Sequence, residues 1–348
     1  MRRIHDMLAV MLVTAFSLLA SCTKVDTENS FANTSAGNFA ALWTIMDEHY
    51  CFFDYKNSEF GLDWDQVYDR YQEYVYEGMG DMALFEVLSS MLSELRDGHV
   101  NLYGPYDVSR NWSWKEDYPA NYSEEVRDGY LGTDYKIAST GYFYQVLPDN
   151  IGYMTIESFS NAISDSKLDA MLHYLCFCNG LIIDIRNNGG GNLDIAEQVA
   201  SRFTNEKVLT GYTKYKNGPG HNDFSAPVAN YVEPAMSNLR WQKPVALLTN
   251  RGCFSSANDF TVKMKEMPMV TVFGDRTGGG GGLPMSSELP NGWSVRFSSA
   301  PSYDKDMNDI EGGVDPDVFV SMTDSDRLQG IDTIIEAARE WINGLITN

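Results

Sequence analysis

Hydrophobic positions follow two different periods along the chain, and the first period is helical. After residue 38, apolar side chains recur at three- and four-residue intervals, at Phe39, Leu42, Trp43, Ile45, Met46 and Tyr50. Similar patterns start near Asp63, with acidic residues in the first turn, and extend over residues 81–95. Residues 38–105 are therefore predicted to form a helical N-terminal domain.

After residue 105 the pattern changes to short apolar runs that alternate with helical segments. Strands are predicted at 151–159, 180–186, 244–250, 269–275 and 292–298, and helices at 164–175, 193–203, 256–265 and 331–346. This alternation predicts an α/β core over residues 106–348, with a largely parallel sheet covered on both faces. Residues 106–140 are expected to form loops with short strands, and 205–240 an irregular insertion.

The first 37 residues are predicted to lie outside this fold. A positively charged start precedes an apolar run from Met7 to Ala20, which is too short to span a bilayer comfortably. The run ends in the tetrapeptide "LASC" at 19–22, which resembles the signal of bacterial lipoproteins, whose cysteine carries the lipid. We expect a signal peptide over 1–21, a lipid anchor on Cys22 and a polar linker over 22–37. A plain secretory peptide is the alternative.

Composition and charge restrict the partners of the protein. The chain of 348 residues contains 43% hydrophobic residues, which is typical of a packed globular protein. Its formal net charge of -22 leaves no basic stripe for nucleic acid and argues against broad adhesion to anionic lipid. Membrane attachment is therefore expected only through Cys22. The remaining cysteines lie in apolar runs without zinc-ligand spacing, so we expect buried thiols and neither metal nor cofactor at Cys51, Cys176, Cys178 and Cys253.

A pair of serines in "NRGCFSSANDF" (250–260) lies between a predicted strand and a predicted helix. A hydroxyl at this position faces the free N–H groups of the helix start. That arrangement suits a nucleophile whose oxyanion is stabilised by the same amides. Ser255 and Ser256 are the two candidates. A serine that only caps the helix has the same pattern, so both interpretations stay open at this point.

Three further motifs contain residues that could act with this serine. The segment "LIIDIRNNGGGN" (181–192) exposes backbone amides at the carboxyl end of a strand, but matches neither a P-loop nor a dinucleotide fingerprint. His99 in "LRDGHV" is a candidate general base, because histidine titrates near neutral pH. Glu311 in "DIEGGVDPDV" could orient an imidazole. Each motif also has a structural interpretation, as a glycine turn, a structural histidine or a solvated acid.

Taken in order, five segments of the chain resemble the blocks of the S41 peptidases, which comprise the C-terminal processing peptidases and their tricorn-like relatives. The segments are "ML..L.DGHV", "LIIDIRNNGGGN", "LLTNRGCFSSANDF", "VFGDRTGGG" and "EGGVDPDV", and the resemblance runs from about Asn38 to the C-terminus. It implies an α/β fold with a crotonase-like (ClpP/crotonase-type) core and a helical N-terminal subdomain. It also implies endoproteolysis through a serine acyl-enzyme.

Matched by position, the resemblance places the family's nucleophile on Ser255. The oxyanion donors fall on the amide of Ser256 and on the glycine turn, where Gly190 is favoured over Gly191. The processing peptidases use a lysine general base, and Gly280 stands at that lysine's position. Because glycine accepts no proton, a Ser/Lys mechanism is not available there.

The tricorn-like branch takes its base from the N-terminal block, where the matching residue is His99, supported by Glu311. In that branch a serine precedes the histidine, but here the position is Gly98. Glu311 is therefore expected to reach His99 directly or through a bridging water or hydroxyl, with Asp97 as the alternative orienting residue. The processing branch also carries a PDZ domain, and residues 104–151 are roughly half of a typical ~100-residue domain. The branch without a PDZ domain is favoured.

The sequence thus predicts an exported, lipid-anchored serine endopeptidase of a bacterial cell envelope, periplasmic or on the outer surface. It would hydrolyse polypeptides through a Ser255 acyl-enzyme with His99 as general base. The main alternative is a catalytically inactive family member that binds a peptide or apolar ligand in the same cleft, and an esterase-like serine hydrolase is a third. The acidic surface favours basic or neutral substrates.

Overall fold

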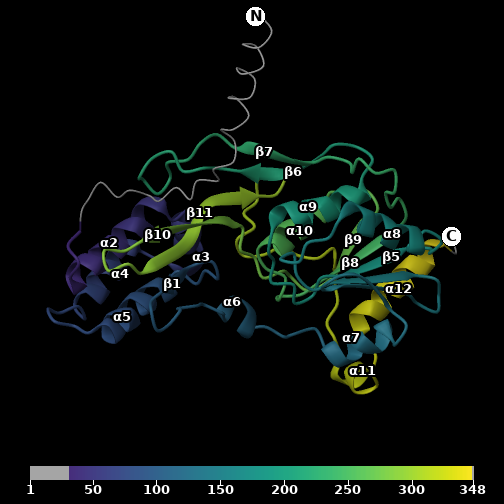
Figure 1. Cartoon of the computed structure of the whole chain (residues 1–348), viewed down its shortest axis with the longest axis horizontal. Helices are drawn as coiled ribbons and strands as arrows, with labels where there is room; N and C mark the ends of the chain where they lie inside the picture. The colour runs from purple at the N-terminus through teal and green to yellow at the C-terminus, as the bar shows by residue number, and fades with distance from the viewer. Residues whose placement is uncertain (1–30, 347–348) are drawn as a thin grey trace, which may run out of the picture.

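The computed structural model describes residues 31–346, which form two lobes connected along one side by a long hairpin (Figure 1). The predicted signal peptide, Cys22 and most of the predicted linker lie outside the described residues. Among the helices within residues 31–346, none is long and apolar enough to cross a membrane.

The N-terminal lobe contains helices α2 (Ser35–His49), α3 (Phe53–Phe60), α4 (Trp64–Gln72) and α5 (Asp81–Ser93). The predicted helices near residues 38, 63 and 81 are confirmed. The starts of α2 and α4 follow capping rules, since the Thr34 side chain accepts from Gly37 N–H and that of Asp63 accepts from Gln66 N–H. Helix α3 was not predicted, because its sequence FDYKNSEF is too short to show a period.

A five-stranded antiparallel sheet packs against these helices. Its order is β1-β11-β6-β7, with β10 also paired to β11. The strands are β1 (Asn101–Tyr103), β6 (Val208–Thr213), β7 (Val228–Val232), β10 (Gly282–Glu288) and β11 (Ser294–Tyr303). Val295 and Phe297 of β11 share one buried core with Leu42 and Leu88 of the helices. The predicted domain boundary at residue 105 therefore falls within a core that β10 and β11 complete from the far end of the chain.

The second lobe is built on a seven-stranded sheet with the order β12-β9-β8-β5-β4-β3-β2. Its strands are β2 (Lys136–Ser139), β3 (Tyr142–Val146), β4 (Gly152–Ile156), β5 (Leu181–Asp184), β8 (Val245–Thr249), β9 (Val270–Gly274) and β12 (Val318–Phe319). The pairings from β12 to β4 are parallel, and β3 and β2 add an antiparallel edge. The predicted strand at 292–298 exists as β11 but belongs to the other sheet.

Helices cover both faces of this sheet, as predicted. Alternate residues of one strand separate the two cores: Ile183 faces α8 (Asp165–Leu175), α9 (Leu193–Ala200) and α10 (Ser256–Lys265), whereas Ile182 faces α12 (Thr333–Ile346). Helix α7 (Glu124–Leu131) contributes to the second core through Leu131. Three short helices complete the lobe, α6 (Ser113–Glu116), η1 (Ser201–Phe203) and α11 (Asp324–Leu328).

Two stretches that were expected to be largely irregular contain regular structure. Residues 106–140 hold α6, α7 and β2, and the supposed insertion at 205–240 is the β6–β7 hairpin, so that prediction was wrong. The hairpin strands are only partly buried, and their mixed composition gave no alternation to read. The connection between them reaches the N-terminal lobe, where His221 Nε2 lies 2.7 Å from Asp47 Oδ1 and the ring stacks on Phe53.

Candidate active site

Ser255 stands at a strained turn between the buried strand β8 and helix α10. Its φ is 57° and its ψ is -121°, a positive-φ conformation that costs free energy for any residue with a side chain. The turn is fixed by backbone hydrogen bonds, including 2.9 Å from Ser255 N–H to Gly279 carbonyl oxygen. The Ser255 side chain makes no capping hydrogen bond to α10. Of the two interpretations left open by the sequence, the structure therefore does not support the simple cap.

The hydroxyl of Ser255 instead contacts the imidazole of His99, with Oγ and Nε2 2.9 Å apart. His99 follows α5 at the entrance to β1 and is 2% exposed. Its ring packs against Phe254, at 4.8 Å between centroids, and its backbone N–H donates to Asp97 Oδ1 at 2.7 Å. The two residues lie 156 positions apart in sequence, so the contact depends on packing between the lobes.

The buried environment keeps the imidazole of His99 neutral at physiological pH. Burial lowers the pKa of His99 to about 4, the nearby charge of Asp97 opposes this, and the charge of Arg296 adds to it. A neutral imidazole can accept the proton of a serine hydroxyl through Nε2. The other ring nitrogen, Nδ1, is buried and has no hydrogen-bond partner among the described residues.

Glu311 does not contact His99, although it was predicted to support it. Its Oε1 forms a buried ion pair with Lys56 Nζ at 3.0 Å, and its Oε2 accepts from Gly281 N–H at 3.0 Å. Burial, followed by the charge of Asp97, raises the pKa of Glu311, and Lys56 opposes that rise. The carboxylate was expected beside the imidazole because the family pattern places it there. Here the carboxylate binds the turn that contains Gly281. Its partner Lys56 comes from α3, and the sequence gave no signal for this pairing.

Asp97, the alternative orienting residue, is 1% exposed and contacts the main chain of His99 and not its ring. The second carboxylate oxygen, Oδ2, accepts from Ser298 Oγ at 2.9 Å and from Tyr50 Oη at 3.1 Å. These contacts join α2, β11 and the histidine turn. Asp97 thus fixes the backbone that carries the imidazole.

Two backbone N–H groups beside Ser255 donate to no described residue, those of Ser256 and Gly191. The N–H of Gly190 is occupied, because it donates to Asn188 Oδ1 at 2.9 Å. The sequence-based preference for Gly190 as the second oxyanion donor is therefore revised in favour of Gly191. Gly190 has a different role, since a Cβ at its position would lie 2.6 Å from the Phe254 carbonyl oxygen.

Gly98 and Gly280, the two departures from the family pattern, both lie against the stacked rings of Phe254 and Trp114. The two rings are 4.2 Å apart. A Cβ at Gly280, the lysine position, would lie 2.6 Å from the Phe254 ring, and one at Gly98 would lie 2.6 Å from Trp114 Nε1. The aromatic pair thus occupies the space that a lysine or a serine would need.

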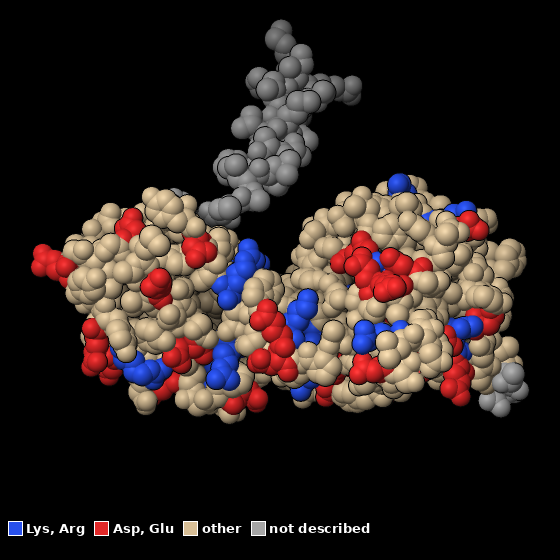
Figure 2. Space-filling view, turned by 90° about the horizontal axis from the view of Figure 1, so that it is seen from below, with Lys and Arg blue, Asp and Glu red and all other residues tan. Residues whose placement is uncertain are grey.

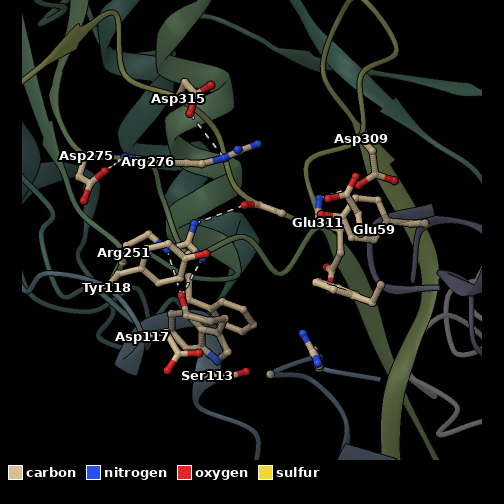
Figure 3. A pocket seen from close by; sticks show the side chains of 18 of the residues that line it. Glu59, Ser113, Asp117, Tyr118, Arg251, Asp275, Arg276, Asp309, Glu311 and Asp315 are labelled. Atoms are coloured by element: carbon tan, nitrogen blue, oxygen red, sulfur yellow. Dashed lines mark hydrogen bonds and ion pairs between the residues drawn. The ribbon is translucent and has the colours of Figure 1, made fainter. Parts of the chain in front are cut away.

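Two cavities flank the Ser255–His99 pair. The smaller, of about 90 Å³, is lined by Ser255 together with Gly191, Ser256, Leu283, Pro284 and Arg296, among others. The larger, of about 600 Å³, is lined by Gly98 and Phe254 and by charged side chains of both lobes. Figure 3 shows Glu311 and Arg276 in this larger cavity, with Arg276 directed toward Asp315. On the face seen in Figure 2, charged side chains of both signs border the hollow between the lobes.

The described residues include no arrangement suited to a metal ion. Within residues 31–346, no group of three or more His, Cys, Asp or Glu side chains could hold one. The cysteines there are free thiols; Cys51, Cys178 and Cys253 are buried, whereas Cys176 is only half-buried. The chemistry available to this site is that of a serine, a neutral imidazole and backbone amides.

Comparisons with known proteins identify the family of this chain. The profile of peptidase family S41 matches residues 150–320, and that of the tricorn protease C1 domain matches residues 31–93. The crystal structure of a candidate peptidase from Parabacteroides merdae ATCC 43184 superposes with a TM-score of 0.84 at 51% identity, covering 89% of this chain and 97% of its own. The chain belongs to peptidase family S41.

More distant relatives support the fold of this S41 peptidase. Mature CPAF superposes with a TM-score of 0.67 at 13% identity, over 88% of this chain and 96% of its own, which shows likeness of fold alone. The predicted ClpP/crotonase-like core with a helical N-terminal part is confirmed. A candidate CtpA-like serine protease of Staphylococcus epidermidis is 28% identical over 174 residues, 49% of this chain. The match spans only 34% of that protein, about a third of its length.

Proposed function

We propose that this S41 peptidase is a serine endopeptidase in which Ser255 attacks the peptide carbonyl and His99 is the general base. The observation that carries the proposal is the 2.9 Å contact between Ser255 Oγ and His99 Nε2. It occurs at a strained elbow whose neighbouring N–H groups, on Gly191 and Ser256, are unoccupied. A nucleophile, a base and oxyanion donors are the parts that acyl transfer requires.

The reaction follows from these positions. As Ser255 Oγ bonds to the substrate carbonyl carbon, its proton passes to His99 Nε2, and the N–H groups of Gly191 and Ser256 stabilise the oxyanion. Collapse of the tetrahedral intermediate breaks the C–N bond, and the imidazolium donates its proton to the leaving amine. Water then hydrolyses the acyl-enzyme, with His99 again as base.

Glu311 supports this machinery from a distance. Its main-chain oxygen accepts from Gly280 N–H and its side chain from Gly281 N–H, so it braces the turn at 277–282. The same turn holds the elbow, because Gly279 accepts from Ser255 N–H. We infer that Glu311 positions Ser255 through this turn and does not act on the imidazole.

The adjacent serines provide a matched experiment. Ser255→Ala should abolish hydrolysis of casein and labelling by a fluorophosphonate probe. Ser256→Ala removes a buried hydroxyl that has no hydrogen-bond partner among the described residues and keeps the backbone N–H, so it should retain most activity. Fluorophosphonate labelling that survives Ser255→Ala would place the nucleophile elsewhere.

One observation favours the alternative of an inactive, ligand-binding relative. Nδ1 of His99 is buried without a described acceptor, and an imidazolium would need one there. Under this alternative the purified protein would bind peptides saturably without turnover, and Ser255→Ala would not change the affinity. Turnover that depends on Ser255 decides against it.

We also propose that the enzyme is exported and anchored in the cell envelope by lipid on Cys22. Support comes from the apolar run and the "LASC" sequence at 19–22. Metabolic labelling with an alkynyl palmitate should mark the membrane-bound protein, and Cys22→Ser should remove the label and release the protein from membranes. A membrane-bound, unlabelled protein would contradict the lipid anchor.

A further inference from the structure

Arg296 lies on β11 and lines the small cavity that contains Ser255. Its neighbours Val295 and Phe297 point into the core of the N-terminal lobe, so Arg296 and Ser298 face the opposite side of the strand. On that side Ser298 Oγ reaches Asp97 at 2.9 Å, which places this face of β11 beside the histidine turn. Arg296 is close enough to His99 for its charge to lower the pKa of the imidazole.

The guanidinium of Arg296 makes no hydrogen bond or ion pair with any residue of 31–346. The guanidinium groups of Arg96 and Arg110 lie over the rings of Phe60 and Trp112, but of these three arginines Arg296 is the one that lines the cavity with Ser255. The contrast with Arg251, which lines the larger cavity, is informative: its guanidinium is occupied by the carbonyl oxygens of Trp114 and Thr277, at 2.7 Å and 2.8 Å. Arg296 is only half-buried, yet its five donors have no described acceptor.

The other charged group in the small cavity does not neutralise Arg296. Asp259 also lines the cavity, but its Oδ2 is paired with Lys263 Nζ at 2.9 Å. Lys263 is bound in addition to Glu197 at 3.2 Å, so these charges form their own network. Arg296 is left as an uncompensated cation a short distance from the nucleophile.

We propose that Arg296 determines specificity by binding a carboxylate of the substrate next to the scissile bond. The planar guanidinium fits a carboxylate through two parallel hydrogen bonds, and partial burial strengthens such a pair. The cavity of about 90 Å³ has room for one small group, so the carboxylate belongs to a residue adjacent to the cleavage point. It is either an Asp or Glu side chain or the free carboxylate of a substrate's C-terminus.

This inference rests on the proposed endopeptidase activity, and it runs against the expectation from net charge. A surface with a net charge of -22 favours basic or neutral polypeptides at long range. Arg296 acts only at contact distance, inside a cleft. The substrate class it selects is a polypeptide with an acidic group at the cleavage site.

The test uses internally quenched peptides that differ only at the two residues flanking the cleaved bond. Each of these residues is Glu, Gln or Lys in turn. Every peptide is made as a C-terminal acid and as an amide. For the parent enzyme, Glu at one position, or the free terminus, should raise kcat/KM by about 10- to 100-fold over its neutral counterpart. Dependence on the terminal acid identifies the C-terminus as the source of the carboxylate, and dependence on Glu identifies the side chain.

Variants of Arg296 separate recognition from catalysis. Arg296→Gln should remove the preference, so that kcat/KM for the Glu peptide falls to the value for the Gln peptide, and Arg296→Glu should turn it into a preference for Lys. Arg327→Gln, which removes an equal charge from α11, is the control and should keep the parent preference. Equal loss on all peptides in Arg296→Gln, or no preference in the parent enzyme, overturns the proposal.

Peptide binding to Ser255→Ala, which lacks the nucleophile, distinguishes failure of the Arg296 proposal from failure of the proposed endopeptidase activity. If no peptide is cleaved, the endopeptidase proposal fails, but Arg296 is still tested by fluorescence anisotropy with Ser255→Ala. That variant should bind the Glu or free-acid peptide more tightly than the neutral one. The double variant with Arg296→Gln should bind both equally. Equal affinity in Ser255→Ala itself overturns carboxylate recognition.

Discussion

The serine half and the histidine half of this site are held in place in different ways. The serine elbow at 250–256 is fixed mostly by main-chain hydrogen bonds within its own lobe, such as Cys253 N–H to the Asn250 carbonyl oxygen and Phe254 N–H to that of Asn188. The histidine turn is fixed by side chains from distant elements, with Tyr50 and Ser298 on Asp97. The nucleophile is therefore positioned mainly by one lobe, whereas the position of the base depends on the packing of one lobe on the other.

This difference determines which half is sensitive to changes far from the chemistry. A substitution at Tyr50, at the end of α2, leaves the hydrogen bonds of the elbow intact but can move His99 through Asp97. Peptide hydrolysis needs Oγ and Nε2 within hydrogen-bond reach, so small displacements between the lobes should reduce the rate more than the stability. The following experiments test this asymmetry.

Removing the base should have the largest effect. His99→Ala is expected to lower kcat for a peptide substrate by about 10⁴- to 10⁶-fold, because a nucleophile without its base retains little activity. Fluorophosphonate labelling of Ser255 should slow in parallel. The far-UV circular dichroism should not change, since the elbow does not depend on the imidazole. A near-normal rate would rule out His99 as base.

A lysine restored at the family position should damage the site and not rescue it. Gly280→Lys adds a side chain where φ is 79° and where a Cβ would lie 2.6 Å from the Phe254 ring. Strain and overpacking together should cost about 2–5 kcal/mol in the free energy of unfolding measured with urea. Gly129→Lys, which adds the same side chain in open space on α7, is the control. Recovered hydrolysis in a His99→Ala, Gly280→Lys double variant would contradict the steric argument.

The buried ion pair between Lys56 and Glu311 tests the dependence of the site on α3. Lys56→Met leaves a buried carboxylate without its partner and should destabilise the fold by about 3–5 kcal/mol. Glu311→Gln added to it removes that charge while keeping an acceptor for Gly281 N–H, so the double variant should recover most of the stability. If the single and double variants are equally unstable, the lost stability comes from packing of the lysine stem and not from the unpaired carboxylate.

The same asymmetry explains what could be predicted from sequence. A candidate serine follows from a strand, a glycine and a helix start that are contiguous in the chain, and the family resemblance assigned Ser255 as nucleophile and the amide of Ser256 as oxyanion donor. The choice between Gly190 and Gly191 depended on where the Asn188 side chain points, which no spacing reveals. Lys56 was missed because α3 showed no period.

The fold was predictable to a similar degree. Strands buried on both faces, such as β5 and β8, are continuous apolar runs and were identified. The β6–β7 hairpin was not, since its strands pack on one edge of β11 and are partly exposed. The support expected from Glu311 for His99, by direct contact or through a bridge, came from the family pattern, and the Phe254–Trp114 pair that accompanies the change at Gly98 appears only in three dimensions.

The smallest expected effects are opposite shifts in the pH profile. Proton transfer from Ser255 requires the neutral form of His99. We therefore expect kcat/KM to fall tenfold per pH unit below the pKa of His99, which burial lowers to about 4. The charged groups that act on the imidazole are Asp97, which raises the pKa, and Arg296, which lowers it. Asp97→Asn should move the acid limb to lower pH and Arg296→Gln should move it to higher pH, measured on a neutral peptide. Shifts of the same sign in both variants would show that displacement of the ring, and not local charge, controls the base.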